Sequence, residues 1–416
     1  MRTAADTSGH ASPPPSGGLL ITGSHPMDRT MVEAVRLEDG LPVWWHDSRQ
    51  VLSDLICLDD ALFVISCAIA RDRRNGRAEL VALRARDGVV VWRTDRDRVQ
   101  RRLARRRLGW WLRTLWRTSS PTTAWNAARM FELAGLPGYT NLAATGELVL
   151  VGAGSIIFAF RARSGTLRWI RPLLSGGDHR LIAARNGAVY IHGDRSALEA
   201  LDARTGRVWW SSDQDFYVES LAASDTHVHL SGGSSHGPFL ASLNAVDGTR
   251  EHMWPLHPGE HLAALADDGT AYLSRGSRLF AVRLAEEKEI WCSAPLRDAP
   301  DDDDDAFHVS SVCVEAGGQA VFYGFAESYR PSRTGRAVVG ALDARSGATR
   351  WEWRGPERPL PASGAPSLLA ACGNVYVTSS AGIFALRGGD GHLVWQSPGG
   401  VAIQRAVVSL DSARPE

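Results

Sequence analysis

Histidine side chains are the first candidates for chemistry in this sequence, because they bind metal ions and move protons near neutral pH. Several of the 13 histidines fall in the second half of the chain, at His227, His229, His236, His252, His257, His261 and His308. His227 and His229 alternate in a strand-like stretch and would therefore share one face of a strand. No Cys or His partner lies at the spacing of a zinc finger, so we expect no zinc site.

A run of aspartates could supply the hard oxygen ligands that calcium prefers. The run extends from Asp301 to Asp305, and its candidate ligands are Asp301, Asp303 and Asp305. It lacks the interleaved spacing and the glycine of an EF-hand loop. A solvated acidic loop is therefore the favoured interpretation, and no bound metal is expected.

A basic and aromatic stretch is the third candidate for function. It contains eight arginines and no acidic residue between Arg98 and Arg117. Leucine and tryptophan recur at the i, i+3, i+4, i+7 spacing of a helix, at Leu108, Trp111, Leu112 and Leu115. The pattern predicts a helical insertion at about residues 98–135. The residues expected to contact a partner are Arg101, Arg102, Arg105, Arg106, Arg107, Trp110, Trp111 and Trp116.

Several interpretations of this stretch compete. A lid or partner-binding helix is favoured, and peripheral membrane contact comes next, because Trp and Leu opposite Arg is the pattern of an interfacial helix. Nucleic-acid contact is less favoured, since no second basic stripe accompanies the first. A plain solvated insertion is the remaining alternative.

A repeated phrase provides the frame that must position these residues. In the copy from Ala200 to Trp210, a turn begins at Asp202 and closes on Gly206. An Asp side chain can accept hydrogen bonds from the backbone a few residues on, and Gly accepts the positive φ that tight hairpins need. The flanking segments are therefore predicted to be antiparallel strands, and the Trp four residues after the Gly a buried anchor.

The phrase occurs eight times, and two of its copies are imperfect. In one copy the Trp is displaced by two residues, to Trp254, and in the next Glu287 stands in the place of the Gly. Two further strand-like runs precede each copy, which gives four strands in about 40–45 residues, the length of a propeller blade. The predicted anchors are Trp44, Trp92, Trp169, Trp210, Trp254, Trp291, Trp351 and Trp395.

The phrase Ala-Leu-Asp-Ala-x-x-Gly-x-x-x-Trp resembles the repeat of quinoprotein-type (PQQ-like) β-propellers, over about residues 19–410. This family includes quinoprotein dehydrogenases, an outer-membrane assembly lipoprotein and sensor or scaffold domains. The resemblance implies an all-β fold of eight four-stranded antiparallel blades. The dehydrogenases share adjacent cysteines and a calcium near the quinone. The present sequence has no Cys-Cys pair, which favours the non-dehydrogenase branch.

The two chain ends are expected to close the ring. The first blade lacks its fourth strand at the front of the chain, whereas Val401 to Leu410 is a strand left over at the back. Pairing the two would complete one blade from both ends. Residues 1–18 and 411–416 are expected to be tails, the first of them disordered because it is rich in Ser, Pro and Gly.

Two long links interrupt the repeats, at about residues 95–139 and 295–307. Both follow the Trp-bearing last strand of a blade, so they share a face with the loops between second and third strands. By blade count they lie four junctions apart, across the ring. Elaborated loops on one face of a rigid scaffold commonly carry function, so we place function on that face.

Composition sets limits on the partners and the compartment. The chain has 46 basic and 46 acidic residues, so no global field argues for a polyanionic partner. Its N-terminus lacks the apolar segment of a secretory signal. The five cysteines are odd in number and scattered, which suggests a reducing compartment and predicts a cytoplasmic location. They are Cys57, Cys67, Cys292, Cys313 and Cys372.

The sequence favours a non-catalytic propeller scaffold that binds a protein partner, or a membrane surface, through its elaborated face. No cofactor is expected. The first alternative is an enzyme that uses the central channel, either with PQQ or as a pathway-specific catalyst. The second alternative is a sensor domain for a small ligand.

Overall fold

The computed structural model describes most of the strands and hairpin turns of the chain. The described residues are 7–10, 18–24, 30–48, 51–58, 61–67, 78–95, 140–153, 156–172, 181–192, 198–212, 216–234, 237–257, 260–266, 268–296, 309, 311–315, 318–329, 334–359, 366–379, 381–398 and 403–409.

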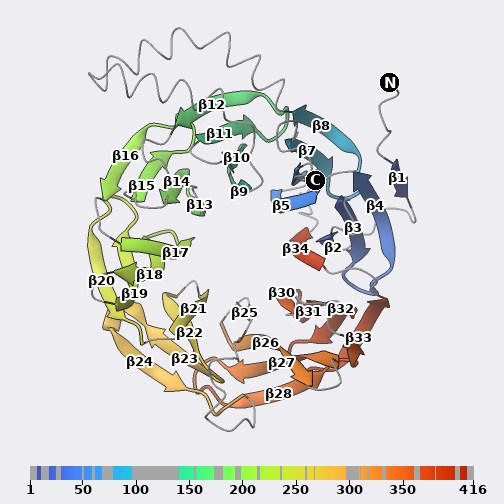
Figure 1. Cartoon of the computed structure of the whole chain (residues 1–416), viewed down its shortest axis with the longest axis vertical. Coiled ribbons are helices and arrows are strands. Elements are labelled where there is room, and N and C mark those ends of the chain that lie inside the picture. Colours follow the sequence, from blue (N-terminus) through green and yellow to red (C-terminus); the bar gives the residue numbers. More distant parts are fainter. Residues whose placement is uncertain are drawn as a thin grey trace, which may run out of the picture.

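Eight antiparallel sheets stand around a central axis, so the chain is an eight-bladed β-propeller (Figure 1). Each blade has four strands, which run in order from the axis to the rim in blades 2 to 8. The predicted all-β, eight-bladed fold is confirmed.

Blades 1 to 4 are formed by the first half of the chain and by its last strand. Blade 1 contains β34 (Ile403–Ser409), β2 (Leu19–Ser24), β3 (Thr30–Arg36) and β4 (Pro42–Ser48). Blade 2 contains β5 (Val51–Leu58), β6 (Ala61–Cys67), β7 (Ala78–Arg84) and β8 (Val90–Asp95). Blade 3 contains β9 (Thr140–Thr145), β10 (Leu148–Ala153), β11 (Ile156–Arg161) and β12 (Leu167–Pro172). Blade 4 contains β13 (Leu181–Arg185), β14 (Ala188–His192), β15 (Leu198–Asp202) and β16 (Val208–Ser212).

Blades 5 to 8 complete the ring. Blade 5 contains β17 (Phe216–Ala223), β18 (His227–Ser234), β19 (Gly237–Asn244) and β20 (Arg250–Pro255). Blade 6 contains β21 (Glu260–Leu265), β22 (Thr270–Arg275), β23 (Arg278–Arg283), the 3-10 turn η2 (Leu284–Glu286) and β24 (Lys288–Cys292). Blade 7 contains β25 (Ser311–Val314), β26 (Ala320–Tyr329), β27 (Thr334–Asp343), β28 (Thr349–Arg354) and the short β29 (Arg358–Pro359) beside β27. Blade 8 contains β30 (Ser367–Ala371), β31 (Asn374–Ser379), β32 (Gly382–Arg387) and β33 (Leu393–Pro398).

The repeated turn forms for the reason the sequence suggests. Between β15 and β16, the Asp202 side chain accepts a hydrogen bond from the Thr205 N–H at 2.7 Å. Gly206 has a φ of 68° and donates its N–H to the Asp202 carbonyl at 2.8 Å. A glycine tolerates this left-handed backbone conformation without steric cost, so the turn closes tightly and the two strands pair antiparallel.

The apolar core lies between blades. Each of the eight core clusters among the described residues joins two neighbouring blades. In one of them, Leu150 and Ile157 of blade 3 pack with Val189 and Leu201 of blade 4. Burial of apolar area therefore stabilises the ring rather than any single sheet, which alone would leave both of its faces uncovered.

A tryptophan pins each blade to the next at seven of the eight junctions. The indole N–H donates to a backbone carbonyl in the turn of the following blade, at 2.7 to 3.0 Å. The ring lies over the turn glycine, where an added Cβ would come within 2.4 to 2.8 Å of it. The pinned residues are Trp44, Trp92, Trp169, Trp210, Trp291, Trp351 and Trp395.

The chain ends close the ring as expected. β34 pairs antiparallel with β2, with Ile21 opposite Val407, and forms the innermost strand of blade 1 (Figure 1). The Trp395 indole of blade 8 donates to the Leu37 carbonyl of blade 1 at 2.8 Å, 358 residues away in sequence.

The N-terminal segment contains a strand that the sequence does not suggest. β1 (Thr7–His10) pairs antiparallel with β4 and adds a fifth strand to the outer edge of blade 1, with Gly9 opposite Trp45 (Figure 1). The expectation of a disordered tail over residues 1–18 did not include it, because Thr-Ser-Gly-His has no apolar alternation.

Other expectations concern parts of the chain that the structure describes only partly. The predicted helical insertion at about 98–135 and the aspartates at 301–305 lie outside the described residues. No disulfide joins the four cysteines whose side chains are described. Among the described residues, no helix is long and apolar enough to cross a membrane.

Two adjacent tryptophans allow a matched test of the pin. Trp210 is 8% exposed and pinned, whereas Trp209 is 50% exposed. Trp210→Ala should lower the free energy of unfolding by about 3–5 kcal/mol, because it removes a buried ring and its hydrogen bond. Trp209→Ala should cost about 1 kcal/mol or less. Urea unfolding measures both, and equal losses would contradict the pinning role.

Removal of the closing strand should damage the whole ring. A chain that ends at residue 401 lacks β34, which leaves the inner edge of β2 unpaired and uncovers Leu20 and Ile21, both fully buried in the full chain. We expect loss of the cooperative thermal transition or a fall in Tm of more than about 10 °C. A chain that ends at residue 410 is the control and should melt like the full chain.

Candidate functional site

The propeller has two faces that differ in their connections. Turns between first and second strands lie beside turns between third and fourth strands, as shown by the hydrogen bonds Ala162 N–H to Glu147 O and Ala203 N–H to Gly187 O, both 2.8 Å. We name this side the turn face. Because the strands are antiparallel, links between blades and loops between second and third strands lie on the opposite side, the link face.

The two long links leave from the link face, as predicted. One leaves β8 at Asp95 and returns at β9, and the other leaves β24 at Cys292 and returns at β25. Their blades lie on opposite sides of the ring (Figure 1). The predicted partner-binding side chains, Arg101 to Trp116, and the candidate ligands Asp301, Asp303 and Asp305 lie outside the described residues.

The repeats provide an internal standard against which an unusual blade can be recognised. In most blades, one cross-strand row carries an aromatic residue on the second strand, Ala on the third and the pinned Trp on the fourth. Blade 4 has Tyr190, Ala200 and Trp210 in this row, and its two rings lie 6.0 Å apart. The same row reads Phe63-Ala82-Trp92, Tyr272-Ala281-Trp291, Phe322-Ala341-Trp351 and Tyr376-Ala385-Trp395 in other blades.

Blade 5 replaces this apolar row with three polar side chains. Its row reads His229, Ser242 and His252, because His229 is opposite Ser242 and Ser242 is opposite His252. Trp254, the expected anchor, instead lies opposite Leu240 and packs against the core between blades 5 and 6. The structure therefore places His252, and not Trp254, at the anchor position.

The following blade carries a matching replacement. Glu287 occupies the place of the turn glycine and keeps the left-handed conformation, with a φ of 48°. At the other junctions a Cβ at this place would collide with the Trp ring. Glu287 is therefore compatible with its neighbour only because His252 replaces the Trp, and the two replacements belong together.

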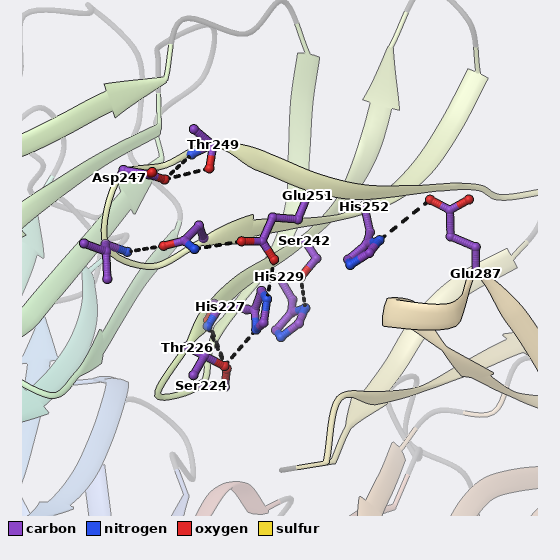
Figure 2. A network of polar contacts seen from close by, with 12 residues as sticks. Ser224, Thr226, His227, His229, Ser242, Asp247, Thr249, Glu251, His252 and Glu287 are labelled. Atoms are coloured by element: carbon purple, nitrogen blue, oxygen red, sulfur yellow. Dashed lines mark hydrogen bonds and ion pairs between the residues drawn. The ribbon is translucent and has the colours of Figure 1, made fainter.

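A polar network surrounds these histidines at the turn face of blade 5 (Figure 2). His227 Nε2 lies 2.8 Å from Glu251 Oε2, and its Nδ1 lies 2.8 Å from Thr226 Oγ1. A neutral imidazole with its proton on Nε2 satisfies both contacts, since it donates to the carboxylate and accepts from the hydroxyl. Asn244 Nδ2 also donates to Glu251 at 2.7 Å.

The electrostatics of the network follow from these contacts. The hydrogen bond from Asn244, followed by that from His227, lowers the pKa of the Glu251 carboxyl. Burial, with the nearby His227 and His252, lowers the pKa of His229 from 6.5 to about 4. His229 is only 3% exposed, and its Nδ1 lies 3.1 Å from Ser242 Oγ. His229 is therefore neutral at pH 7.

An ion pair spans the junction where the pin is missing. His252 Nδ1 of blade 5 lies 3.8 Å from Glu287 Oε1 of blade 6 (Figure 2). The pair is long and partly exposed, so it contributes less than a buried indole and its hydrogen bond. The junction between blades 5 and 6 keeps its apolar core but has a partly exposed polar contact in place of the buried indole pin.

The chemistry open to this network is limited by its geometry. No group of three or more His, Cys, Asp or Glu side chains in the described part of the chain is arranged to hold a metal ion. Ser242 is 2% exposed, so a substrate carbonyl cannot reach its hydroxyl for nucleophilic attack.

The sequence predicted that His227 and His229 share one face of a strand. In the structure their rings lie 5.7 Å apart on β18, which confirms this prediction.

Three polar side chains of the innermost strands are engaged by the protein itself. The Leu142 N–H of blade 3 donates to Asp54 of blade 2 at 2.9 Å, and the Leu368 N–H of blade 8 donates to Ser311 of blade 7 at 3.0 Å. Glu260 accepts from the His257 N–H at 2.7 Å and lies 3.2 Å from Arg275. Among the described residues we assign no set of side chains to a calcium–quinone group, and we derive no quinone chemistry.

Fold and repeat together define the class of protein: an eight-bladed propeller with PQQ-like repeats and tryptophan-pinned blades. A model of the family described as "Outer membrane protein assembly factor BamB" matches residues 113–250, 152–307 and 241–410. These matches cover well over half of the sequence, and the chain belongs to this family.

Solved structures with the same fold have diverse functions. BamB from Moraxella catarrhalis is 13% identical with a TM-score of 0.51, and the match covers 87% of this chain and 95% of that protein. The computationally designed protein Ika8 is 11% identical with a TM-score of 0.57, over 94% and 100% of the two chains. A quinohemoprotein alcohol dehydrogenase from Pseudomonas putida HK5 is 12% identical with a TM-score of 0.54, over 93% and 69%.

At these identities, similarity to the solved structures shows the fold alone. A search of curated proteins found no significant match. What the protein binds must therefore be argued from its own residues.

Acid should weaken the fold through His229. The unfolded imidazole has a pKa near 6.5 and the folded one near 4, so between these values the unfolded state binds more protons. The free energy of unfolding should therefore fall by up to about 3 kcal/mol as the pH drops from 6.5 to 4. This stability is fully present above pH 6.5. Urea unfolding between pH 4 and 8 measures the change.

A variant with the apolar row of other blades isolates this effect from that of the carboxylates. The double substitution His229→Phe with Ser242→Ala reproduces the Phe-Ala pair of blades 2 and 7. It should retain the acid sensitivity of the rest of the protein but lose the component between pH 6.5 and 4. Identical pH profiles for the two proteins would contradict the assignment to His229.

The replacements at 252 and 287 should be energetically coupled. His252→Trp alone should destabilise the protein, because the indole meets the Cβ of Glu287. In combination with Glu287→Gly, the same substitution should stabilise it by restoring the pin. We expect a coupling free energy of about 1–3 kcal/mol in a double-mutant cycle of urea unfolding. Additive effects on the free energy of unfolding would show that the two substitutions act independently.

Proposed function

We propose that this protein is a non-catalytic scaffold that binds a protein partner through its link face. The observation that carries the proposal is the departure of both long links from this one face, on opposite sides of the ring. Membership of the BamB family supports it, since this propeller fold can act as a protein-binding scaffold.

The rigidity of the ring supports the same function. Seven indole pins and eight inter-blade cores hold the blades, so the roots of the links have fixed positions. A partner that contacts both links gains affinity because little conformational entropy is lost in the scaffold itself. The turn face, by contrast, is formed by short and similar hairpins, which offer a less distinctive surface.

The chemistry of the first link suggests how a partner is held. The eight arginines between Arg98 and Arg117 provide fork-shaped donors for carboxylates, and the tryptophans provide large apolar contacts. Arg and Trp are the residue types enriched at the energetic centres of protein interfaces. We therefore assign partner contact to Arg101, Arg102, Arg105, Arg106, Arg107, Trp110, Trp111 and Trp116.

We further propose that the protein acts in a reducing compartment, the cytoplasm, without a bound cofactor. Scattered cysteines, none of them in a disulfide among the four that are described, support the compartment. Engagement of Asp54, Ser311 and Glu260 within the protein supports the absence of a cofactor.

Charge reversal in the first link tests the proposed face. Arg105→Glu, Arg106→Glu and Arg107→Glu, combined in the full chain, should reduce recovery of specific partners at least about tenfold in quantitative affinity purification. The matched control, Arg250→Glu with Arg345→Glu, changes two exposed arginines of the turn face and should leave recovery unchanged. Equal recovery by the triple variant and the wild type would contradict the proposal.

Two further measurements separate the alternatives. Flotation with vesicles of phosphatidylserine and phosphatidylcholine tests membrane contact, and binding that the triple variant loses would favour a lipid surface over a protein. Titration with PQQ and calcium tests the enzyme alternative. A saturating absorbance change at one equivalent, with a rise in Tm, would replace the scaffold by an enzyme that uses the channel.

A further inference from the structure

The turn-face hairpins contain a recurrent pair of opposite charges. In blades 1, 2 and 8, the residue four positions before the turn glycine is Arg, and the residue immediately before the glycine is Asp. The two side chains form ion pairs at 2.6 to 3.0 Å. The pairs are Arg36–Asp39, Arg84–Asp87 and Arg387–Asp390.

A second position can also reach the residue four before the glycine. It is the residue three after the glycine, at the bulge in the fourth strand. In blade 7, Arg350 at this bulge pairs with Asp343 at 2.7 Å. In blade 5, Glu251 at the bulge accepts from Asn244 at 2.7 Å. The hairpin geometry therefore brings two residues close to the side chain four positions before the glycine. One is the residue immediately before the glycine, and the other is the residue three positions after it.

Blade 3 alters both positions around its arginine. Arg161 stands four before Gly165, but Ser164 replaces the Asp, and Arg168 stands at the bulge. Ser164 Oγ instead lies 2.9 Å from Thr166 Oγ1. Both arginines are exposed, and neither forms an ion pair with any described residue. Two guanidinium groups thus occupy places that hold an ion pair in blade 7, and the carboxylate is missing.

The adjoining hairpin of blade 4 extends this basic surface. Trp169 donates to the Ala203 carbonyl at 2.7 Å, so the β11–β12 hairpin lies directly against the β15–β16 turn (Figure 1). Three further exposed arginines, Arg163, Arg204 and Arg207, lie in or beside these two turns and have no ion pair among the described residues.

Few acidic groups of this region offset the five arginines. Glu199 is engaged by Arg171 at 3.0 Å, Asp202 accepts from the Thr205 N–H, and Asp225 is held by Arg185 at 2.6 Å. Glu147 is exposed on the neighbouring turn. A net positive surface remains on the turn face of blades 3 and 4, in a chain whose overall charge is zero.

We propose that this turn surface of blades 3 and 4 binds an acidic segment of a partner protein, one of whose carboxylates is shared by Arg161 and Arg168. The external carboxylate takes the place that Asp fills within blades 1, 2 and 8. Arg163, Arg204 and Arg207 supply further fork-shaped donors for neighbouring acidic side chains.

The size of the surface favours a short peptide segment over a larger polyanion. Nucleic acids and anionic membranes need a broad, continuous basic field, whereas here five arginines are interleaved with Glu147 and Asp202. Specific pairing with a few carboxylates fits this pattern better. The site lies on the turn face, and so it is independent of the link-face function proposed above.

A substitution that restores the repeat's own carboxylate gives a sharp test. Ser164→Asp places an Asp immediately before the glycine, as in blades 1, 2 and 8. This Asp should form an intramolecular ion pair with Arg161. Ser164→Ala removes the hydroxyl without adding a charge and is the matched control. Arg168→Glu removes one of the two guanidinium groups, with Arg345→Glu, on the turn of blade 7, as its control.

The probe is a fluorescein-labelled peptide of alternating Glu and Ala, used in fluorescence anisotropy with the full chain at 50 mM and 200 mM NaCl. We expect saturable binding that weakens with salt and falls about tenfold in Ser164→Asp and in Arg168→Glu, about the effect of one charge-assisted contact. Ser164→Ala and Arg345→Glu should bind like the wild type. Thermal melting confirms that each variant is folded.

Three outcomes would overturn the inference. The first is no saturable binding of the Glu-Ala peptide, and the second is an equal loss in Arg345→Glu. The third is tighter binding, lost in Arg168→Glu, of phosphatidylserine vesicles or of a ten-nucleotide single-stranded DNA, which would assign the surface to another polyanion. None of these results depends on the arginines at 105–107, so the link-face proposal stands or fails separately.

Discussion

One contact holds this ring together: an indole that donates its N–H to a carbonyl of the next blade while its ring covers the glycine beside that carbonyl. The contact needs both partners, since a Cβ at the glycine would come within 2.4 to 2.8 Å of the ring. The positive φ belongs to the turn itself, since Glu287 keeps it at the junction without an indole, whereas the indole requires that no Cβ be present. Repetition of the contact at seven junctions, with the last one made by Trp395 to Leu37, converts eight sheets into a closed body.

The junction between blades 5 and 6 stands out because the same rule is broken on both sides at once. His252 replaces the indole and Glu287 replaces the glycine, and the Cβ of Glu287 is tolerated because no indole covers it. Their ion pair is longer and more exposed than the pins, whereas the apolar core behind it is kept. The ring is therefore held there by apolar burial and by a long polar contact, without the indole pin that the other junctions have.

The two faces of the ring offer different structural features to a binding partner. The link face has long insertions rooted in rigid strands, and the turn face has short hairpins whose differences lie in single side chains. Where most hairpins neutralise their own arginine, blade 3 presents Arg161 and Arg168 without a carboxylate. A protein with such faces is suited to hold partners on both sides of the disc, which is consistent with a scaffold and requires no chemistry in the channel.

The sequence by itself determined the blade count, the strands and the closure by β34, because glycine and tryptophan recur at a fixed spacing and each has one physical role in the turn. It did not determine which residue occupies the anchor position of blade 5. Trp254 is the nearest tryptophan in the sequence, but the pairing of β19 with β20 sets His252 opposite Ser242 and Trp254 opposite Leu240, so His252 takes the anchor position. The strand β1 was missed because its pairing depends on the edge of β4 rather than on its own residues. Only the tertiary structure decided that Glu287 faces His252 and that Arg168 lies at the bulge of the hairpin that contains Arg161, since strand pairing and neighbouring blades bring together residues that no local pattern connects.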